Sequence, residues 1–234
     1  MKIAILSDIH ANIEAFELVM KNIDKDDIDA ILIAGDLVGY YYHPDKVINI
    51  CMSRDDIYCI RGNHDKNFLN ALEDEKLMKK LISKYGSSYR ITQKKLSDNQ
   101  IYWLQNLPPK IEIELDNKMI TMAHGSIKSE VEYVYPNQTN IDLIKHLSNS
   151  MYTILGHTHH PFTWNNKDRW LINPGSIGQP RDQSAVSSYF YLDLKSNVLE
   201  HKKIKFFIEN ILSEISEFDP ENEYLHKVLT RNPQ

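Results

Sequence analysis

Residues 1–36 have the sequence MKIAILSDIHANIEAFELVMKNIDKDDIDAILIAGD, which contains two short apolar runs separated by an amphipathic segment. The runs Ile3–Leu6 and Ala30–Ala34 suit strands that are buried on both faces. Between them, residues 13–20 place apolar side chains at helical spacing. The order strand, helix, strand therefore predicts the beginning of an α/β fold.

The same alternation continues downstream. Pro44 suits the first turn of a helix that reaches about Cys51, and Ile57–Ile60 is a third apolar run. Three strands separated by helices are typical of parallel strands with crossover connections. Residues 66–107 are predicted to be mostly helical, and Pro108 ends that region.

The second half of the chain is richer in strand patterns. Strands are predicted at Ile111–Leu115, Met119–Ala123, Tyr152–Leu155, Trp170–Ile172, Ser187–Leu194 and Val198–Phe207, with a helix near Ile141–Leu147 and a helical tail at Ile208–Phe218 and Glu221–Leu229. The sequence contains no repeat and no Pro- or Gly-rich linker. We therefore expect one α/β domain of two packed sheets over residues 1–207, and a helical C-terminal extension over residues 208–234 that packs on it.

Composition narrows the functional classes. The chain has 234 residues, of which 42% are hydrophobic and 25% charged, as in an ordinary soluble globular domain. No run approaches the roughly 20 apolar residues of a membrane span, and Asp8 interrupts the first apolar run before it could form a signal peptide. The two cysteines, Cys51 and Cys59, form no CxxC pair. These features predict a cytoplasmic protein with no membrane partner.

Net charge bears on the partners. At −5, the chain lacks the excess of Lys and Arg that a broad nucleic-acid-binding face requires, so nucleic acid is disfavoured. The run Ile204–Phe207 and the tail helix would either cover a sheet edge or form the interface of a homo-oligomer. Packing of these segments into the core is a simpler explanation than either.

Five polar clusters share one position, since each directly follows an apolar run. They are Asp8-x-His10, Gly35-Asp36, Gly62-Asn63-His64-Asp65, His124-Gly125 and Gly156-His157-Thr158-His159. In open α/β sheets, ligands bind outside the carboxyl ends of the strands, where loops distant in sequence converge. We therefore expect the clusters to meet in one site.

The donor types in these clusters indicate a metal centre. Carboxylate, amide and imidazole groups without a thiolate suit divalent ions such as Mn²⁺, Fe²⁺ or Zn²⁺. The candidate ligands are Asp8, His10, Asp36, Asn63, His124, His157 and His159. Seven ligands suffice for two ions if one carboxylate bridges them, and two such ions can activate a hydroxide for attack on a phosphate ester. His64 is then free to protonate the leaving oxygen.

In this order the motifs D-x-H, G-D, G-N-H-[DE], H and G-H-x-H resemble the calcineurin-like metallophosphoesterase superfamily, over Asp8 to His159. The resemblance implies a four-layer α/β/β/α sandwich of two mixed sheets. It implies that Asp8, His10, Asp36 and His159 hold one metal, that Asp36, Asn63, His124 and His157 hold the other, and that Asp36 bridges. His64 corresponds to the catalytic histidine of the family. Two divalent ions are expected as cofactors, Mn²⁺ first and Fe²⁺, Zn²⁺ or Ni²⁺ as alternatives.

The segment Asn173–Arg181 resembles one that is typical of the small bacterial and archaeal phosphodiesterase branch. Within it, Arg181 is a candidate for a further phosphate contact. Arg61 is another candidate, with a surface charge as the alternative. Asn12 could contact phosphate or cap a helix, and Asp65 is expected to orient His64 or a loop amide.

Three consecutive tyrosines, Tyr40, Tyr41 and Tyr42, follow the second cluster. They would either form an aromatic wall for a nucleobase or pack on the loop after Asp36. Substrate identity therefore stays open between a small phosphodiester and a phosphomonoester, including a nucleotide or a dinucleoside polyphosphate.

Other functions fit the same residues less well. Serine/threonine protein phosphatases resemble G-D-x-x-D-R-G after the second strand, whereas Gly35–Tyr41 lacks the second Asp and the Arg. A DNA nuclease is disfavoured by the acidic balance. A non-catalytic scaffold with the same fold could lose His64 or several ligands, yet all of them are present.

Overall fold

Ten strands form two mixed five-stranded sheets in the computed structural model, which describes residues 1–231. The first sheet has the order β10-β9-β1-β2-β3. Its strands are β1 (Lys2–Leu6), β2 (Ala30–Ile33), β3 (Ile57–Cys59), β9 (Val186–Asp193) and β10 (Val198–Lys205). The strands β1, β2 and β3 are parallel, as the alternation of strands and helices predicts, and β9 and β10 add to this sheet in antiparallel pairings.

The second sheet has the order β4-β5-β6-β8-β7. Its strands are β4 (Lys110–Leu115), β5 (Lys118–Ala123), β6 (Tyr152–Ile154), β7 (Phe162–Asn166) and β8 (Arg169–Asn173). Strand β7 was not predicted from the sequence. It is a short edge strand with alternating exposure, and it pairs antiparallel with β8 across a tight turn at Lys167, whose φ is 57°. The pairing with β8 stabilises this strand, and its own sequence shows only a weak apolar pattern.

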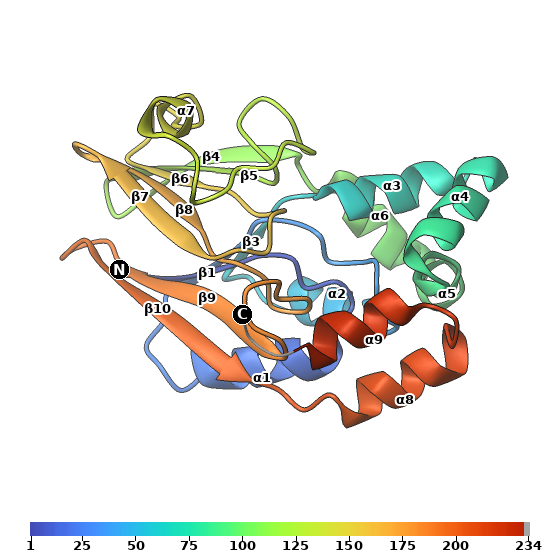
Figure 1. Cartoon of the computed structure of the whole chain (residues 1–234). Helices are drawn as coiled ribbons and strands as arrows, with labels where there is room; N and C mark the ends of the chain where they lie inside the picture. The colour runs from blue at the N-terminus through green and yellow to red at the C-terminus, as the bar shows by residue number, and fades with distance from the viewer. Residues whose placement is uncertain (232–234) are drawn as a thin grey trace.

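Nine helices of the described residues surround the sheets. They are α1 (Ile13–Ile23), α2 (Pro44–Met52), α3 (Asn63–Ala71), α4 (Glu75–Tyr85), α5 (Ser88–Lys95), α6 (Asp98–Asn106), α7 (Asn140–Ile144), α8 (Glu209–Phe218) and α9 (Glu223–Thr230). Figure 1 shows the layers in order, with α7 above the second sheet and α1 below the first. The predicted four-layer α/β fold is confirmed, although its outer layer on the second sheet contains only one short helix.

Strand alternation explains why the first sheet can bury both faces. Ile3 and Ile5 of β1 point toward the second sheet and pack with Ile120 and Ile154. Ala4 and Leu6 alternate with these residues along β1, so they point to the other face and pack in the apolar cluster that contains the helices. The first sheet is therefore one of the two inner layers, between its helices and the second sheet.

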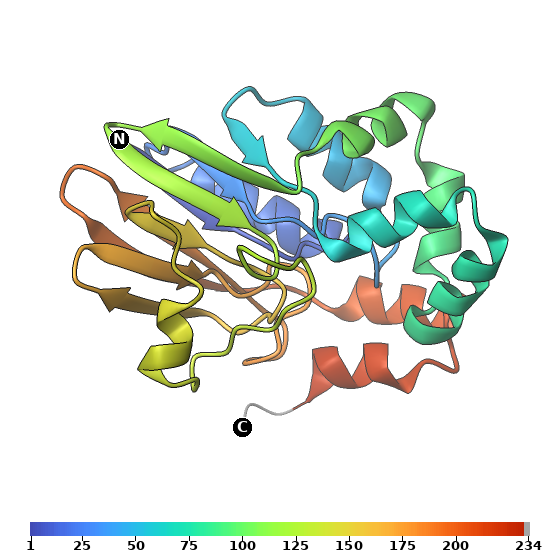
Figure 2. The ribbon, with the colours of Figure 1, turned by 90° about the horizontal axis from the view of Figure 1, so that it is seen from above.

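Helices α8 and α9 belong to the same core as α1 and α2. Ile211, Ile215 and Leu225 are buried in the apolar cluster that also contains Phe16 and Val47. In Figures 1 and 2 these two C-terminal helices lie beside the group α3 to α6, at the end of the sheets where β1 and β2 finish. The division of the chain at residue 207 stays a prediction.

Within residues 1–231, no helix combines the length and the apolar character needed to span a membrane.

Candidate metal centre

The polar clusters meet because of strand register. Since β1 and β2 are parallel neighbours, Asp8 and Asp36 leave the first sheet side by side, and the amide of Asp8 donates to the Gly35 carbonyl at 3.0 Å. The parallel neighbours β5 and β6 place His124 and His157 together in the same way, with the Gly156 amide 2.7 Å from the His124 carbonyl. Face-to-face packing of the sheets then brings the two pairs together.

Asp8, His10 and His159 form a first group of donors. The Nε2 atom of His159 lies 3.2 Å from Oδ1 of Asp8 and 3.1 Å from Nε2 of His10. The Nε2 atom of His10 lies 3.6 Å from the same Asp8 oxygen. All three side chains are buried, and one donor atom of each lies within 4.8 Å of the others. This group could hold one metal ion.

Asp36, His124 and His157 form a second group, with Asn63 beside it. The Nε2 atom of His124 lies 3.1 Å from Oδ2 of Asp36 and 3.0 Å from Oδ1 of Asn63. Oδ2 of Asp36 also lies 3.8 Å from Nε2 of His10. One carboxylate oxygen therefore faces both groups, which is the position of a bridging ligand.

Three histidines are oriented by backbone carbonyls that contact Nδ1. These contacts join His10 to Val38 at 3.1 Å, His124 to Ala34 at 2.7 Å and His159 to Gln179 at 2.6 Å. A carbonyl only accepts, so in the neutral ring the proton sits on Nδ1 and the lone pair on Nε2 points into the cluster. The facing lone pairs of His10 and His159 cannot bond each other. A cation between them would satisfy both, so the donors fit a metal ion.

The two carboxylates are held in a similar way. Oδ2 of Asp8 accepts from the Ser7 hydroxyl at 2.7 Å and from the His157 amide at 2.9 Å, and Oδ1 of Asp36 accepts from the His64 amide at 2.7 Å. The other oxygen of each carboxylate is buried without a hydrogen-bond partner. Burial opposes ionisation, but the nearby imidazoles outweigh it and hold the pKa of Asp8 and Asp36 well below the usual range.

The loops that carry these side chains have an unusual backbone. The φ angles of Asp8, His10, Asp36, His157 and His159 lie between 53° and 68°, in the left-handed region that is costly for residues other than glycine. Gly62 and Gly156 allow the loops to approach closely. A Cβ atom on Gly62 would meet the Asp36 carboxylate, and one on Gly156 would meet the Ser7 hydroxyl.

Asp65 holds the loop after β2, as one of its predicted roles required. Its Oδ1 accepts from the amides of Leu37 and Val38, and its Oδ2 accepts from those of Asp36 and Gly62, at 2.9 to 3.0 Å. Four backbone donors thus converge on one buried carboxylate. Asp65 fixes the direction of Asp36 without reaching the cluster itself.

The segment Asn173–Arg181 supports the same loops from behind. Asn173 donates to the Gly156 carbonyl at 2.7 Å and to the Thr158 hydroxyl at 2.9 Å. The Ser176 hydroxyl donates to the Asp8 carbonyl at 2.7 Å. Most of this motif therefore holds the metal loops in place.

His64 lies beside the cluster, at the start of α3. The hydroxyl of Tyr89 contacts its Nδ1 at 2.8 Å. Burial lowers the pKa of His64 to about 3, although Asp36 acts in the opposite direction, so the ring is neutral at pH 7. A ring nitrogen of His64 also lies within 4.8 Å of donors on His10 and Asp36, so distance alone does not exclude it as a ligand.

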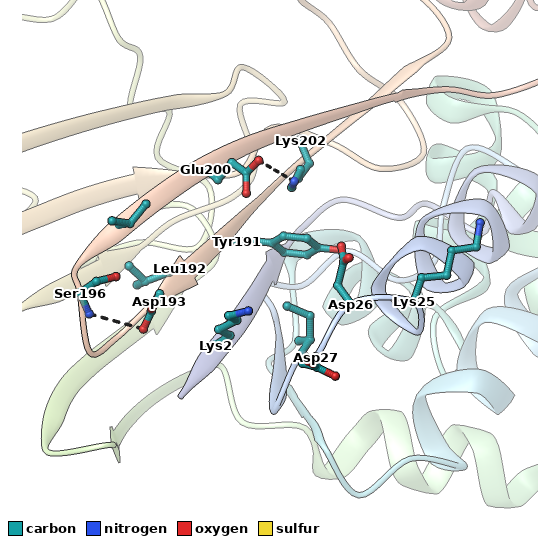
Figure 3. A pocket seen from close by; sticks show the side chains of 12 residues that line it. Lys2, Lys25, Asp26, Asp27, Tyr191, Leu192, Asp193, Ser196, Glu200 and Lys202 are labelled. Carbon is teal, nitrogen blue, oxygen red and sulfur yellow. Dashed lines mark hydrogen bonds and ion pairs between the residues drawn. The ribbon is translucent and has the colours of Figure 1, made fainter.

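A cavity of about 410 Å³ opens onto the cluster. It is lined by Asp36, Tyr40, Asn63, His64, Asn67, Lys84, Tyr85, Val131, Tyr133, His157, His159 and Arg181. A somewhat larger cavity of about 490 Å³ lies at the opposite end of β1, around Tyr191, Lys2 and Asp26 (Figure 3). Its lysines and acids are mixed without converging donors, so volume alone does not identify the site.

The structure separates the predicted substrate contacts. Tyr40 and Arg181 line the cavity next to the cluster, whereas Asn12 and Arg61 do not. Asn12 is buried and caps α1 through Oδ1, and its Nδ2 donates to the Gly178 carbonyl at 2.8 Å. Arg61 contacts the Gln105 carbonyl at 3.4 Å. The capping alternative thus describes the position of Asn12, and neither residue reaches the cavity.

The three consecutive tyrosines do not form an aromatic wall. Tyr40 is only 5% exposed, and Tyr41 and Tyr42 are buried. The more exposed aromatic side chains of the cavity are Tyr85 and Tyr133, which sequence reasoning missed together with Tyr89. These three residues lie on helices and a loop outside every motif, so no signal in the sequence marks them.

Comparison with known proteins agrees with this geometry. A family model described as the calcineurin-like phosphoesterase superfamily domain matches residues 1–197. The chain belongs to this superfamily. Its members bind divalent metals and are generally phosphoester hydrolases, in keeping with the clustered Asp and His side chains.

Relatives of the chain share its full extent. An uncharacterized protein of Methanocaldococcus jannaschii is 30% identical over 233 residues, covering 91% of each chain. The crystal structure of a metallophosphoesterase from Sphaerobacter thermophilus matches with a TM-score of 0.80 and 24% identity, covering 98% of each chain. The crystal structure of a protein from Pyrococcus horikoshii matches with a TM-score of 0.84 and 18% identity, covering 97% of each chain. Both structural matches include the part of this chain after residue 197, where the match to the family model ends.

Proposed function

We propose that this chain is a dinuclear-metal phosphoesterase that hydrolyses a small phosphodiester or phosphomonoester, such as a nucleotide or a dinucleoside polyphosphate. Asp8, His10, Asp36 and His159 would hold one ion, and Asp36, Asn63, His124 and His157 the other. Manganese is the proposed metal for both positions. A cytoplasmic location is proposed with it, since the two cysteines are unpaired and buried.

One observation carries the proposal. Oδ1 of Asp8, Oδ2 of Asp36 and Nε2 of His157 are buried acceptors without a hydrogen-bond partner, and they converge within one cluster. Unsatisfied buried acceptors cost about 1–3 kcal/mol each, and more when charged. A metal centre supplies the partners that would offset this cost.

The chemistry follows from the donor set. Two bound divalent ions would bind phosphate oxygens and lower the pKa of a water molecule to near neutrality. The chain itself holds the charges of Asp8 and Asp36 in fixed directions before substrate arrives. Because every ligand candidate is buried, bulk water does not compete for these groups.

His64 would act on the leaving oxygen. If the Tyr89 hydroxyl donates to Nδ1, the single proton of the neutral ring sits on Nε2. His64 could then donate a hydrogen bond from Nε2 to the oxygen that departs from phosphorus, where negative charge develops. Tyr89 would act as a positioning residue by fixing the ring and its tautomer.

A non-catalytic scaffold with the same fold is the second candidate, because some members of the superfamily lack activity. It is favoured less because the complete ligand set is present, and because His64 and four of the seven ligand candidates, Asp36, Asn63, His157 and His159, line one cavity. A protein phosphatase is also favoured less, since the segment after β2 lacks the second Asp and the Arg noted above.

The test combines metal content with turnover. Apo protein is reconstituted with Mn²⁺, Fe²⁺, Zn²⁺ or Ni²⁺ and assayed on phosphomonoesters, cyclic nucleotides, dinucleoside polyphosphates and phosphopeptides, ranked by kcat/KM. We expect two ions per chain and turnover of at least one small ester. Asp36→Asn should weaken the binding of both ions, whereas Asp8→Asn should weaken the binding of one. Two bound ions with no turnover of any ester would leave the scaffold as the better description.

A further inference from the structure

The cavity beside the metal cluster contains two cations that the metal-binding role does not use. Arg181 is half-buried and Lys84 is exposed. Asp36, which belongs to the metal cluster, is the only acidic residue among those that line the cavity. Among the lining residues, two cations therefore stand against one acid.

Arg181 is half-buried without a counter-charge. No carboxylate of the described residues lies within 4.0 Å of its guanidinium, and its Nε is buried without a hydrogen-bond partner. The groups that surround its charge are the phenols of Tyr40, Tyr133 and Tyr224. An N–H donor that is buried without a partner costs about 1–3 kcal/mol, so the Nε of Arg181 indicates an acceptor, such as an anionic oxygen, that binds there.

Charge counting shows that a single phosphate leaves this group unmatched. On the proposed function, two divalent ions contribute +4 while Asp8 and Asp36 contribute −2. The centre alone therefore matches one phosphate dianion. Arg181 and Lys84 add two further positive charges in the same cavity, beside His157 and His159. Guanidinium groups bind phosphate oxygens through two parallel hydrogen bonds, and phenols can donate further ones.

We propose that the cavity binds an organic diphosphate, with the reacting phosphate at the metal cluster and the neighbouring phosphate on Arg181 and Lys84. This inference rests on the proposed function and narrows its substrate to a phosphoanhydride. A cavity of about 410 Å³ has room for two linked phosphates. Tyr85 and Tyr133 at the rim would contact the organic group that the diphosphate carries.

The reaction balances as a hydrolysis. Water adds its oxygen to the reacting phosphorus, and the bond from that phosphorus to the bridging oxygen breaks. The bridging oxygen departs with the second phosphate as an anion, which would accept a hydrogen bond from His64 in the same cavity. The two protons of the water end on the product phosphates or in solvent, and His64 keeps its own. Arg181 would stabilise the charge that gathers on the departing phosphate.

Binding of two small probes tests the proposal without turnover. Inorganic phosphate and methylenediphosphonate, which cannot be hydrolysed, are titrated into the metal-loaded protein by calorimetry at fixed free Mn²⁺, and ion content is measured afterwards. We expect the diphosphonate to bind at least ten-fold more tightly than phosphate. Arg181→Gln should weaken the binding of the diphosphonate at least ten-fold and the binding of phosphate less than three-fold.

Arg169→Gln is the matched control. Arg169 is a half-buried arginine whose guanidinium contacts the Ser148 carbonyl at 3.1 Å, at the far end of β8. The Arg169→Gln variant should bind both probes as tightly as the wild type does. Equal weakening of both probes in Arg181→Gln would overturn the proposal, because Arg181 would then contact the reacting phosphate. An absence of any diphosphonate preference in the wild type would overturn it as well.

A second measurement separates ligand binding from a structural role. Because its charge is unpaired, replacing Arg181 by Gln should leave the melting temperature of the metal-free protein unchanged or higher. A fall of several degrees would show that Arg181 stabilises the fold, contrary to the proposal. Failure of the proposed function is distinguishable, since it would appear as absent turnover while the difference between the two probes persists.

Discussion

At the scale of single residues, each acidic ligand candidate divides its work between two oxygens. One oxygen of Asp8 and one of Asp36 accept hydrogen bonds from the chain, which leaves the other oxygen directed into the cluster. The three histidines divide their two nitrogens in the same way. Donors that are already oriented lose little conformational entropy when an ion binds.

His64→Ala is expected to lower turnover while both ions stay bound. A hydrogen-bond donor to a developing oxyanion contributes about 10²–10³-fold, and it contributes most when the leaving oxygen is a poor leaving group. The loss should therefore be large for an alkyl ester and much smaller for a p-nitrophenyl ester, whose leaving oxygen needs no proton. Steady-state kinetics on both esters, together with metal analysis, check this. A drop in metal stoichiometry would make His64 a ligand instead.

His124 should make metal binding depend on pH. In the metal-free protein burial lowers its pKa, but Asp36 and then Asp8 outweigh this effect and raise the pKa to about 10. At pH 7 a bound ion must therefore displace one proton. The pKa values of His157 and His159 are lowered to about 4, so these rings release none.

Metal affinity should accordingly rise about ten-fold per pH unit between pH 6.5 and 8. Calorimetry in buffers of different ionisation enthalpy should record about one proton released per chain. His124→Asn should abolish this release. An affinity that does not change with pH would contradict the protonated state of His124.

At the scale of elements, the centre depends on how the loop after β2 meets the start of α3. Asp65, in the first turn of α3, accepts hydrogen bonds from four backbone amides. This single side chain joins two elements that are otherwise connected through β3. The left-handed backbone at Asp36 is stabilised by these bonds.

Asp65→Asn should therefore weaken both the fold and the metal site. The new NH₂ group would face two amide donors, which we expect to cost roughly 2–4 kcal/mol and to lower the melting temperature by about 5–15 °C. Asp98→Asn is the control, because Asp98 is exposed in the first turn of α6. Equal melting temperatures for the two variants would show that the four bonds contribute little.

At the scale of the whole molecule, the C-terminal helices take part in shaping the cavity. Asp219, between α8 and α9, accepts from the Tyr42 hydroxyl at 2.8 Å, the Ser87 amide at 2.7 Å and the Ser87 hydroxyl at 2.8 Å. It thereby joins the loop after β2 to the turn between α4 and α5. Tyr85 and Tyr89 stand on either side of that turn.

Asp219→Ala should lower kcat/KM without changing metal stoichiometry. Loss of three hydrogen bonds would let the turn that carries Tyr85 and Tyr89 shift, and a change of about ten-fold is expected for poor leaving groups. Glu221→Ala, an exposed change in the same connection, serves as the control. Loss of an ion in the Asp219 variant would mean that the helices act on the metal centre and not on the cavity.

The sequence by itself determined the order of strands and helices apart from β7, the superfamily and the convergence of the seven ligand candidates. It could do so because residues that directly follow parallel neighbouring strands must leave the sheets at the same edge. Asp8 and Asp36 are thus brought together by two short apolar runs that are plain in the sequence.

Only the tertiary structure decided which side chains surround that centre. Tyr89 reaches His64 from α5, Tyr133 comes from a loop, and Asp219 joins segments 132 and 177 residues away. It also placed Asn12 at a helix cap and Arg61 outside the cavity. These positions depend on how helices pack on the finished sheets, and packing is specified by shape over the whole core, without a short pattern in the chain.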